Sequence, residues 1–168
     1  IRDRSIIAKA VLSAPRIYIF AKGESYLAGC IFRNNLLKLD RHVTMADDGG
    51  LQTLHVKNGR PGDLFLFLSY SGIHYDYSKY AAALSERGIK PCLITAFSDS
   101  ALARQCDTVL LIPKSERVIG KVANYSSMIS LTYTLQVIYS LIFNQDYQEN
   151  YRVKHEADSF IFTSFAEI

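Results

Sequence analysis

The stretch from Leu64 to Leu68 is apolar at every position and is followed at once by Ser69, Ser71 and Gly72. Because apolar residues do not alternate with polar ones here, the pattern predicts a strand buried on both faces, as in the middle of a parallel sheet. The carboxyl ends of such strands border the crevice where open α/β sheets bind ligands. Hydroxyls and unpaired backbone N–H groups ahead of a helix suit an anion. The segment therefore predicts an anion-binding turn.

Strand-like and helical patterns alternate along the first two thirds of the chain. Short apolar runs predict five strands, over residues 17–20, 43–46, 64–68, 91–95 and 108–112. Helical patterns precede the first strand and fill the connections, over residues 6–11, 26–39, 75–87 and 101–105, and a further one is introduced by residues 47–50 and ends near residue 58. This alternation predicts the α/β class, with a parallel sheet between two layers of helices in a three-layer αβα sandwich. Asp47 and Asp48 are predicted to cap the helix that follows them.

The last third of the chain has a different character. Residues 122–143 form a long helical pattern that is apolar or weakly polar on nearly every side. In a domain this small, such a helix predicts a subunit interface, and a homodimer or higher oligomer is expected. Ser126 and Ser127 are predicted N-cap residues of this helix. The tail over 146–168 ends in an apolar segment, residues 160–165, which we expect to pack on its own domain or on a partner subunit.

Composition limits the classes of function. A chain of 168 residues is long enough for one domain with a substantial core, so we expect a single domain over 1–168 with its core at about 5–145. The net charge of +3 is spread without a basic block, which gives no case for direct binding to nucleic acid or an anionic membrane. No uninterrupted apolar run reaches the roughly 18 residues of a membrane span. Three distant cysteines favour a reducing cytoplasm over a disulfide framework.

Several short motifs, taken together and in order, resemble the SIS (sugar isomerase) domain family of phosphosugar-binding proteins. They are Gly23-Glu24-Ser25, the segment 69–76 (SYSGIHYD), Ile94-Thr95, the segment 100–103 (SALA) and the segment 106–113 (CDTVLLIP). The resemblance covers about residues 5–145. Within the family, the long helix with Tyr125-Ser126-Ser127 at its start is most similar to the effector domain of RpiR-type transcription regulators. Those regulators carry an N-terminal helix-turn-helix domain, which we expect upstream of Ile1 and which this chain lacks.

The resemblance implies a five-stranded parallel sheet in the flavodoxin-like order 2-1-3-4-5. It also implies a pocket at the carboxyl edge of the sheet that holds the phosphate of a sugar phosphate. The residues that match the family's binding motifs, or adjoin them, are Gly23, Ser25, Ser69, Tyr70, Ser71, Gly72 and His74. Two positions depart from the family pattern, because His74 stands where a threonine is typical and Asp76 where a glutamate is common.

Other residues are weaker candidates. Lys22 could counter a phosphate charge, Glu116 could contact sugar hydroxyls, and Ser127 could reach the pocket of its own or a neighbouring subunit. The alternatives are a solvated lysine, a loop carboxylate and a helix cap. His42, His55 and His155 show no metal-binding spacing, so no metal and no cofactor are expected.

The resemblance favours a phosphosugar-sensing effector domain that binds its ligand without converting it. One alternative is an aldose–ketose isomerase with Glu116 as the base, since such an enzyme needs a carboxylate near the C1–C2 protons. Another is a flavodoxin-like redox or signalling module, because similar strand orders occur across many functions. A sensor needs only affinity and two states that the ligand can bias. The protein is expected in the cytoplasm, without membrane attachment, and in contact with DNA only through the missing N-terminal domain.

Overall fold

The computed structural model describes residues 2–120 and 122–165. Twelve elements follow one another along this part of the chain. They are α1 (Arg2–Ser13), β1 (Ile17–Ala21), α2 (Glu24–Leu37), β2 (Val43–Ala46), α3 (Gly49–Asn58), β3 (Leu64–Leu68), α4 (Tyr75–Ser85), β4 (Cys92–Thr95), the 3-10 helix η1 (Ala103–Gln105), β5 (Thr108–Leu111), α5 (Tyr125–Gln145) and α6 (Tyr147–Phe165).

The five strands form one parallel sheet in the order β2-β1-β3-β4-β5, which confirms the predicted order. In the register, Ile17 of β1 lies between Val43 and Leu64, and β3 in turn lies between β1 and β4, so both strands are interior strands of the sheet. Every residue of β1 and of β3 is buried, as their uninterrupted apolar sequences predict. The carboxyl ends of both strands therefore lie at the same edge of the sheet.

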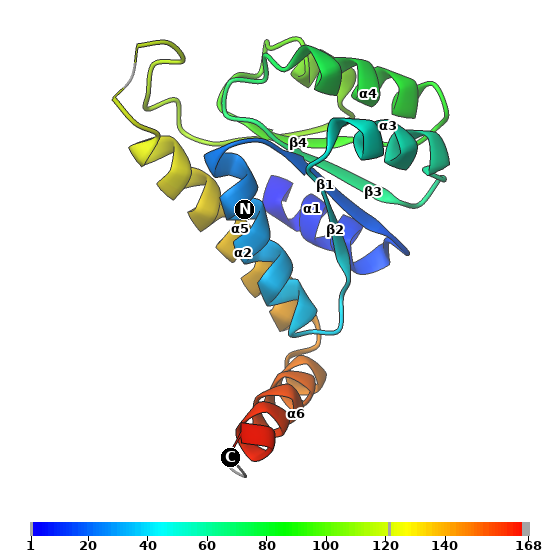
Figure 1. The fold of residues 1–168 in the computed structure, drawn as a ribbon, viewed down its shortest axis with the longest axis vertical. Helices are drawn as coiled ribbons and strands as arrows, with labels where there is room; N and C mark the ends of the chain where they lie inside the picture. The colour runs from blue at the N-terminus through cyan, green and yellow to red at the C-terminus, as the bar shows by residue number, and fades with distance from the viewer. Residues whose placement is uncertain (1, 121, 166–168) are drawn as a thin grey trace.

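Helices cover both faces of the sheet and complete the predicted three layers (Figure 1). Helices α1, α2 and α5 pack on the face to which β1 and β3 direct aliphatic side chains such as Ile19 and Leu66. Helices α3 and α4 lie over the opposite face, where Phe20, Phe65 and Phe67 form an aromatic cluster with Tyr77 of α4. Alternate residues of each strand thus supply two different cores.

Helix α5 has the length and mean hydropathy, 1.3, of a segment that could cross a membrane. It nevertheless lies beside α2 in the domain, and Leu131, Leu135 and Ile138 on its inner face are buried against α1, α2 and the sheet. It is therefore a core helix of the fold. The helix begins at Tyr125, three residues later than predicted, and Val122 is almost fully exposed.

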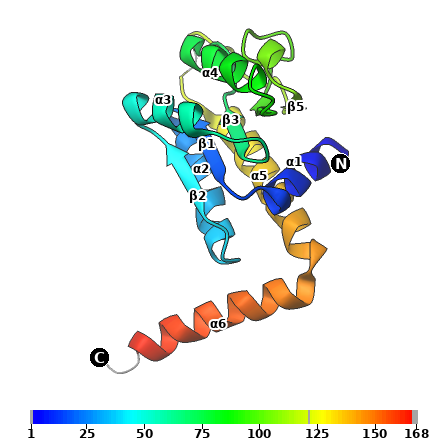
Figure 2. The ribbon, with the colours of Figure 1, turned by 90° about the vertical axis from the view of Figure 1, so that its right-hand side faces the viewer.

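Helix α6 extends away from the rest of the molecule (Figure 2). Its junction with α5 is closed by two polar side chains: Asn150 Nδ2 donates to the carbonyls of Ile142 and Phe143, and Asp146 Oδ1 accepts from Glu149 N. Phe160 and Phe162 are exposed on this helix, and the packing of the tail on its own domain or on a partner subunit stays a prediction. Residues 166–168 of the predicted tail lie outside the described part of the chain.

Local differences from the predicted elements have simple causes. Asp48 caps α3 by accepting from Gly50 N and Leu51 N, whereas Asp47 accepts a hydrogen bond from the Tyr26 hydroxyl, so only one of the predicted pair is a cap. The helix predicted over 101–105 is reduced to η1, in which Gln105 N and Cys106 N bond to the carbonyls three residues back, while Ser100 Oγ accepts from Ala103 N.

Candidate functional site

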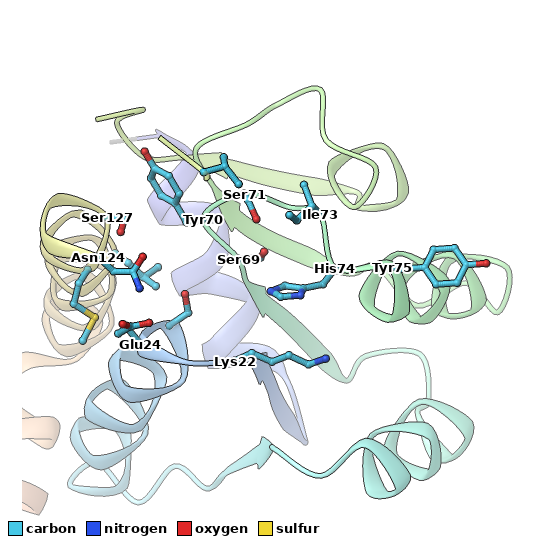
Figure 3. Close-up of a pocket in the computed structure, with 14 residues that line it drawn as sticks. Lys22, Glu24, Ser69, Tyr70, Ser71, Ile73, His74, Tyr75, Asn124 and Ser127 are labelled. Carbon is cyan, nitrogen blue, oxygen red and sulfur yellow. The ribbon is translucent and has the colours of Figure 1, made fainter. Parts of the chain in front are cut away.

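A pocket of about 400 Å³ opens at the carboxyl edge of β1 and β3, against the first half of α5 (Figure 3). The first turns of α2, α4 and α5 all contribute to its wall. The lining residues are Lys22, Glu24, Ser25, Ser69, Tyr70, Ser71, Ile73, His74, Tyr75, Val118, Asn124, Ser127, Met128 and Leu131. Because a helix N-terminus carries unpaired N–H groups and a partial positive charge, this arrangement favours an anionic ligand.

The β3–α4 turn presents two hydroxyls to the pocket. The side chains of Ser69 and Ser71 both point toward its centre in Figure 3. Ser69 is 2% exposed, and its Oγ accepts a hydrogen bond from Gly72 N at 3.1 Å. A hydroxyl that accepts in this way keeps its own proton to donate. Ser69 therefore holds the turn and still offers a donor to a ligand.

Gly72 and Gly23 lie beside the pocket rather than in its wall. Gly72 has a φ of 64°, and a Cβ at this position would overlap the side chain of Ser100. The glycine is thus required by its backbone conformation and by close packing on the loop after β4. Gly23, with a φ of 57°, occupies the N-cap position of α2 and turns the chain so that Ser25 reaches the pocket.

Tyr70 connects the β3–α4 turn to the segment after β5. Its hydroxyl accepts from Ser115 N at 3.0 Å and Glu116 N at 2.8 Å, and donates to the Glu116 carbonyl at 3.1 Å. Its ring, mostly buried, packs edge-on against Phe97. The tyrosine therefore supports the pocket by fixing a neighbouring loop as well as by lining it.

Glu116 acts on the N-terminus of α5. Its carboxylate accepts from Ser127 Oγ at 2.7 Å, Ser127 N at 3.0 Å and Ser126 Oγ at 2.9 Å. These bonds, led by that from the Ser127 hydroxyl, lower the pKa of Glu116 to about 2. The prediction that Ser126 and Ser127 are N-caps is wrong: Asn124 is the N-cap residue, and both serines bind Glu116. A carboxylate with so low a pKa is a weak base at neutral pH.

Lys22 and His74 approach the pocket from two different loops. The Lys22 ammonium lies 5.2 Å from the ring centroid of Tyr77, and the His74 ring lies 5.3 Å from the same ring. His74 stands at the N-cap position of α4 but makes no capping hydrogen bond with its side chain, which points into the pocket in Figure 3. Burial, and next the charge of Lys22, lower the pKa of His74, while Asp76 opposes them.

The sequence pattern of SIS domains matches residues 11–142. This chain belongs to the SIS domain family. Among relatives of this SIS domain, glutamine–fructose-6-phosphate aminotransferase (isomerizing) of Halalkalibacterium halodurans is 35% identical over 107 residues, which are 62% of this chain and 17% of that protein. The Streptococcus pneumoniae protein of the same name is 32% identical over 130 residues, 74% of this chain and 21% of that protein. The SIS domain thus spans about a fifth of the length of these relatives.

Two solved structures share the fold of this SIS domain. One is the sugar isomerase domain of an RpiR transcription factor from Sphaerobacter thermophilus, with a TM-score of 0.80, 22% identity and coverage of 94% of this chain and 86% of that one. The other is the Vibrio vulnificus NanR protein complexed with ManNAc-6P, with a TM-score of 0.85, 19% identity and coverage of 96% and 61%. The predicted family and fold are both confirmed, and the flavodoxin-like redox alternative is not retained.

The structure brings most of the predicted site residues of this SIS domain together. Ser25, Ser69, Tyr70, Ser71 and His74 line the pocket, as do the weaker candidates Lys22 and Ser127, whereas Glu116 lies behind Ser127. Ligand contact by any of them remains a prediction. Among the residues in the described ranges, no three His, Cys, Asp or Glu side chains are placed to hold a metal ion.

Sequence reasoning missed part of the pocket wall of the SIS domain. Glu24 could have been included, because it lies between two predicted residues of the same loop. Asn124 immediately precedes α5, and polar residues that begin helices are recognisable. The apolar residues Val118, Met128 and Leu131 had no such signal, because the place of Met128 and Leu131 depends on how α5 packs beside α2, and Val118 lies in the irregular segment before that helix.

Proposed function

We propose that this SIS domain binds a sugar phosphate without converting it, as the effector domain of an RpiR-type transcription regulator. The observation that carries the proposal is the convergence of two serine-bearing loops and three helix N-termini on one pocket. Ser25, Ser69 and Ser71 then hold the phosphate group, since hydroxyls and helix N-terminal N–H groups donate to anions strongly. The pocket volume of about 400 Å³ lies within the range usual for small-molecule sites.

The relatives support the chemical class of the ligand. The NanR structure of the same fold contains ManNAc-6P, and the curated relatives are named for fructose 6-phosphate. The similarity to the RpiR and NanR domains extends over nine tenths or more of this chain. A regulator needs a DNA-binding part as well, which we place in a helix-turn-helix segment upstream of Ile1 in a cytoplasmic parent protein.

An isomerase is the second candidate, and Glu24 is the observation that favours it. Its carboxylate lines the pocket at the first turn of α2. A carboxylate near a bound sugar is what transfer of a proton between C1 and C2 requires. The sequence alone suggested Glu116 as the base of an isomerase. We propose Glu24 in its place, because the Glu116 carboxylate accepts hydrogen bonds from Ser126 and Ser127.

We also propose a homodimer that uses α5. An apolar groove of about 490 Å³ lies between α2 and α5 and is lined by Ile31, Met128, Ile129, Thr132, Tyr133 and Gln136. Ile129 is 70% exposed and Tyr133 63% exposed. Met128 lines both this groove and the ligand pocket, so a second subunit seated here contacts the wall of the binding site.

The ligand class is tested by thermal shift and titration calorimetry with N-acetylmannosamine 6-phosphate, glucosamine 6-phosphate and fructose 6-phosphate. The unphosphorylated sugars serve as matched controls, and the reaction products are analysed after long incubation. We expect stabilisation by at least one phosphorylated sugar and no conversion. If the wild type converts a sugar phosphate and Glu24→Gln does not, the isomerase is supported and the sensor is contradicted. Equal responses to phosphorylated and unphosphorylated sugars contradict both.

A further inference from the structure

Lys22 and His74 form one side of the pocket and share a common support. The ring of Tyr77 is fully buried, with the Lys22 ammonium on it and the His74 ring in contact distance of it. The two side chains come from different loops, the β1–α2 connection and the start of α4. Lys22 and His74 therefore both line the pocket that the first turns of α2 and α4 border.

The titratable groups around His74 come from the β1–α2 loop and from α4. Lys22 belongs to the β1–α2 loop, and Asp76 and Tyr77 belong to α4 itself, while Glu24 of α2 lines the same pocket. Burial and Lys22 lower the pKa of His74, with Asp76 acting against them. Burial raises the pKa of Tyr77, so this phenol stays neutral across the useful pH range. Without a ligand, burial and the neighbouring Lys22 therefore favour the neutral form of the His74 imidazole.

We propose that His74 takes up a proton from solvent when a phosphate monoester enters the pocket, and that Lys22 and the resulting imidazolium together neutralise the dianion. This inference rests on the proposed function and adds a residue to its binding site. The physical reason is that a dianion beside the imidazole reverses the balance of nearby charge. A neighbouring negative charge stabilises the protonated ring, whereas Lys22 alone destabilises it.

The linked proton gives the affinity a defined pH dependence. Because binding raises the pKa of His74, affinity increases as pH falls from above the bound-state pKa toward the free-state pKa. One full proton per site corresponds to about a tenfold gain per pH unit within that interval. Below pH about 6 the gain is offset, because the phosphate monoester is itself protonated there.

The test measures the His74 pKa directly. His74 is assigned by NMR from the signal lost in His74→Gln, and its ring is titrated in the free protein, with inorganic phosphate, and with N-acetylmannosamine 6-phosphate. We expect a free pKa below 6.5 and an increase of at least one unit with a bound anion. Lys22→Gln is expected to raise the free value, since it removes the neighbouring positive charge.

Calorimetry at pH 7 in two buffers of different ionisation enthalpy then counts the protons. Wild type and the exposed control His42→Gln are expected to take up the same fraction of a proton, and His74→Gln none. Binding with an unchanged His74 pKa, or with equal uptake in His74→Gln, overturns this inference and leaves the proposed function standing. Failure of both anions to bind at millimolar concentration overturns the two together.

Discussion

Ser71 is the side chain on which the anion site can be tested most directly. It lines the pocket and makes none of the structural hydrogen bonds that tie Ser69 to the turn. We expect Ser71→Ala to weaken binding of a sugar phosphate by roughly 1–3 kcal/mol, the usual value of a hydrogen bond to a charged group. Titration calorimetry measures the difference.

Ser13→Ala is the matched control for this experiment. Ser13 ends α1, at the amino end of β1 and so at the opposite edge of the sheet, where its hydroxyl bonds only to its own helix. We expect the affinity of Ser13→Ala for the sugar phosphate to equal that of the wild type. An affinity of Ser71→Ala that equals that of Ser13→Ala contradicts the pocket as described.

The sequence predicts that residues with a hydroxyl directly after a strand belong to the pocket. It does not predict which residues instead bind another part of the protein. Ser25, Ser69 and Ser71 follow strands in the sequence and lie around one pocket. Glu116 also follows a strand, but the sequence does not show that the serines ten and eleven residues later bind its carboxylate. That pairing depends on where α5 begins in space.

At the scale of the element, the start of α5 depends on a carboxylate outside the helix. Glu116 accepts from N–H and hydroxyl groups of the first turn, which favours its ionised form and stabilises the helix end. Its pKa in the folded protein is about 2, below its ordinary value of 4.5. The stabilisation is therefore fully present above pH 4.5 and is lost as pH falls toward 2.

We expect Glu116→Gln to lower the thermal unfolding temperature at neutral pH, and the difference from wild type to shrink steadily between pH 4.5 and pH 2. Unfolding is followed by circular dichroism at each pH. Glu86→Gln, which removes an exposed carboxylate near the end of α4, is the control for a general change in charge. A difference between Glu116→Gln and wild type that stays constant over this pH range contradicts the assigned role.

The strands and the inner helices could be predicted because each has a local cause. An uninterrupted apolar run such as Leu64–Leu68 specifies a central strand, and Asp48 marks the start of α3. The start of α5 was predicted too early, because Val122 continues the apolar pattern although it lies exposed before the helix. Apolar periodicity alone therefore does not locate a helix end that is set by a distant carboxylate.

At the scale of the whole molecule, the proposed dimer can be tested by substitutions in the exposed apolar surface on α2 and α5. Ile129→Glu and Tyr133→Glu place a charge in the groove between the helices, and burial of an unpaired charge in an interface is costly. We expect the wild type to be a dimer by light scattering and both variants to be monomers. Tyr147→Glu, on an exposed position of α6, is the comparison for a surface charge alone. A monomeric wild type contradicts the proposal.

The arrangement of the layers could be predicted, but the direction of α6 could not. Strand order follows from the family resemblance, and the covering of both faces follows from the alternation of elements. The course of α6 is set at Asp146, where α5 ends: Asn150 donates to the last carbonyls of α5, and Asp146 caps the start of α6. Charged residues along α6 predict its solvent exposure and leave its orientation open.

Helix α5 runs without interruption from the pocket, at Asn124 and Ser127, to the junction with α6. A helix of 19 residues is about 28 Å long, so a change of about 10° in its direction moves its far end by about 5 Å. A fluorophore at Ser159, close to the far end of α6, is therefore displaced by a few ångströms when the direction of that helix changes by about 10°.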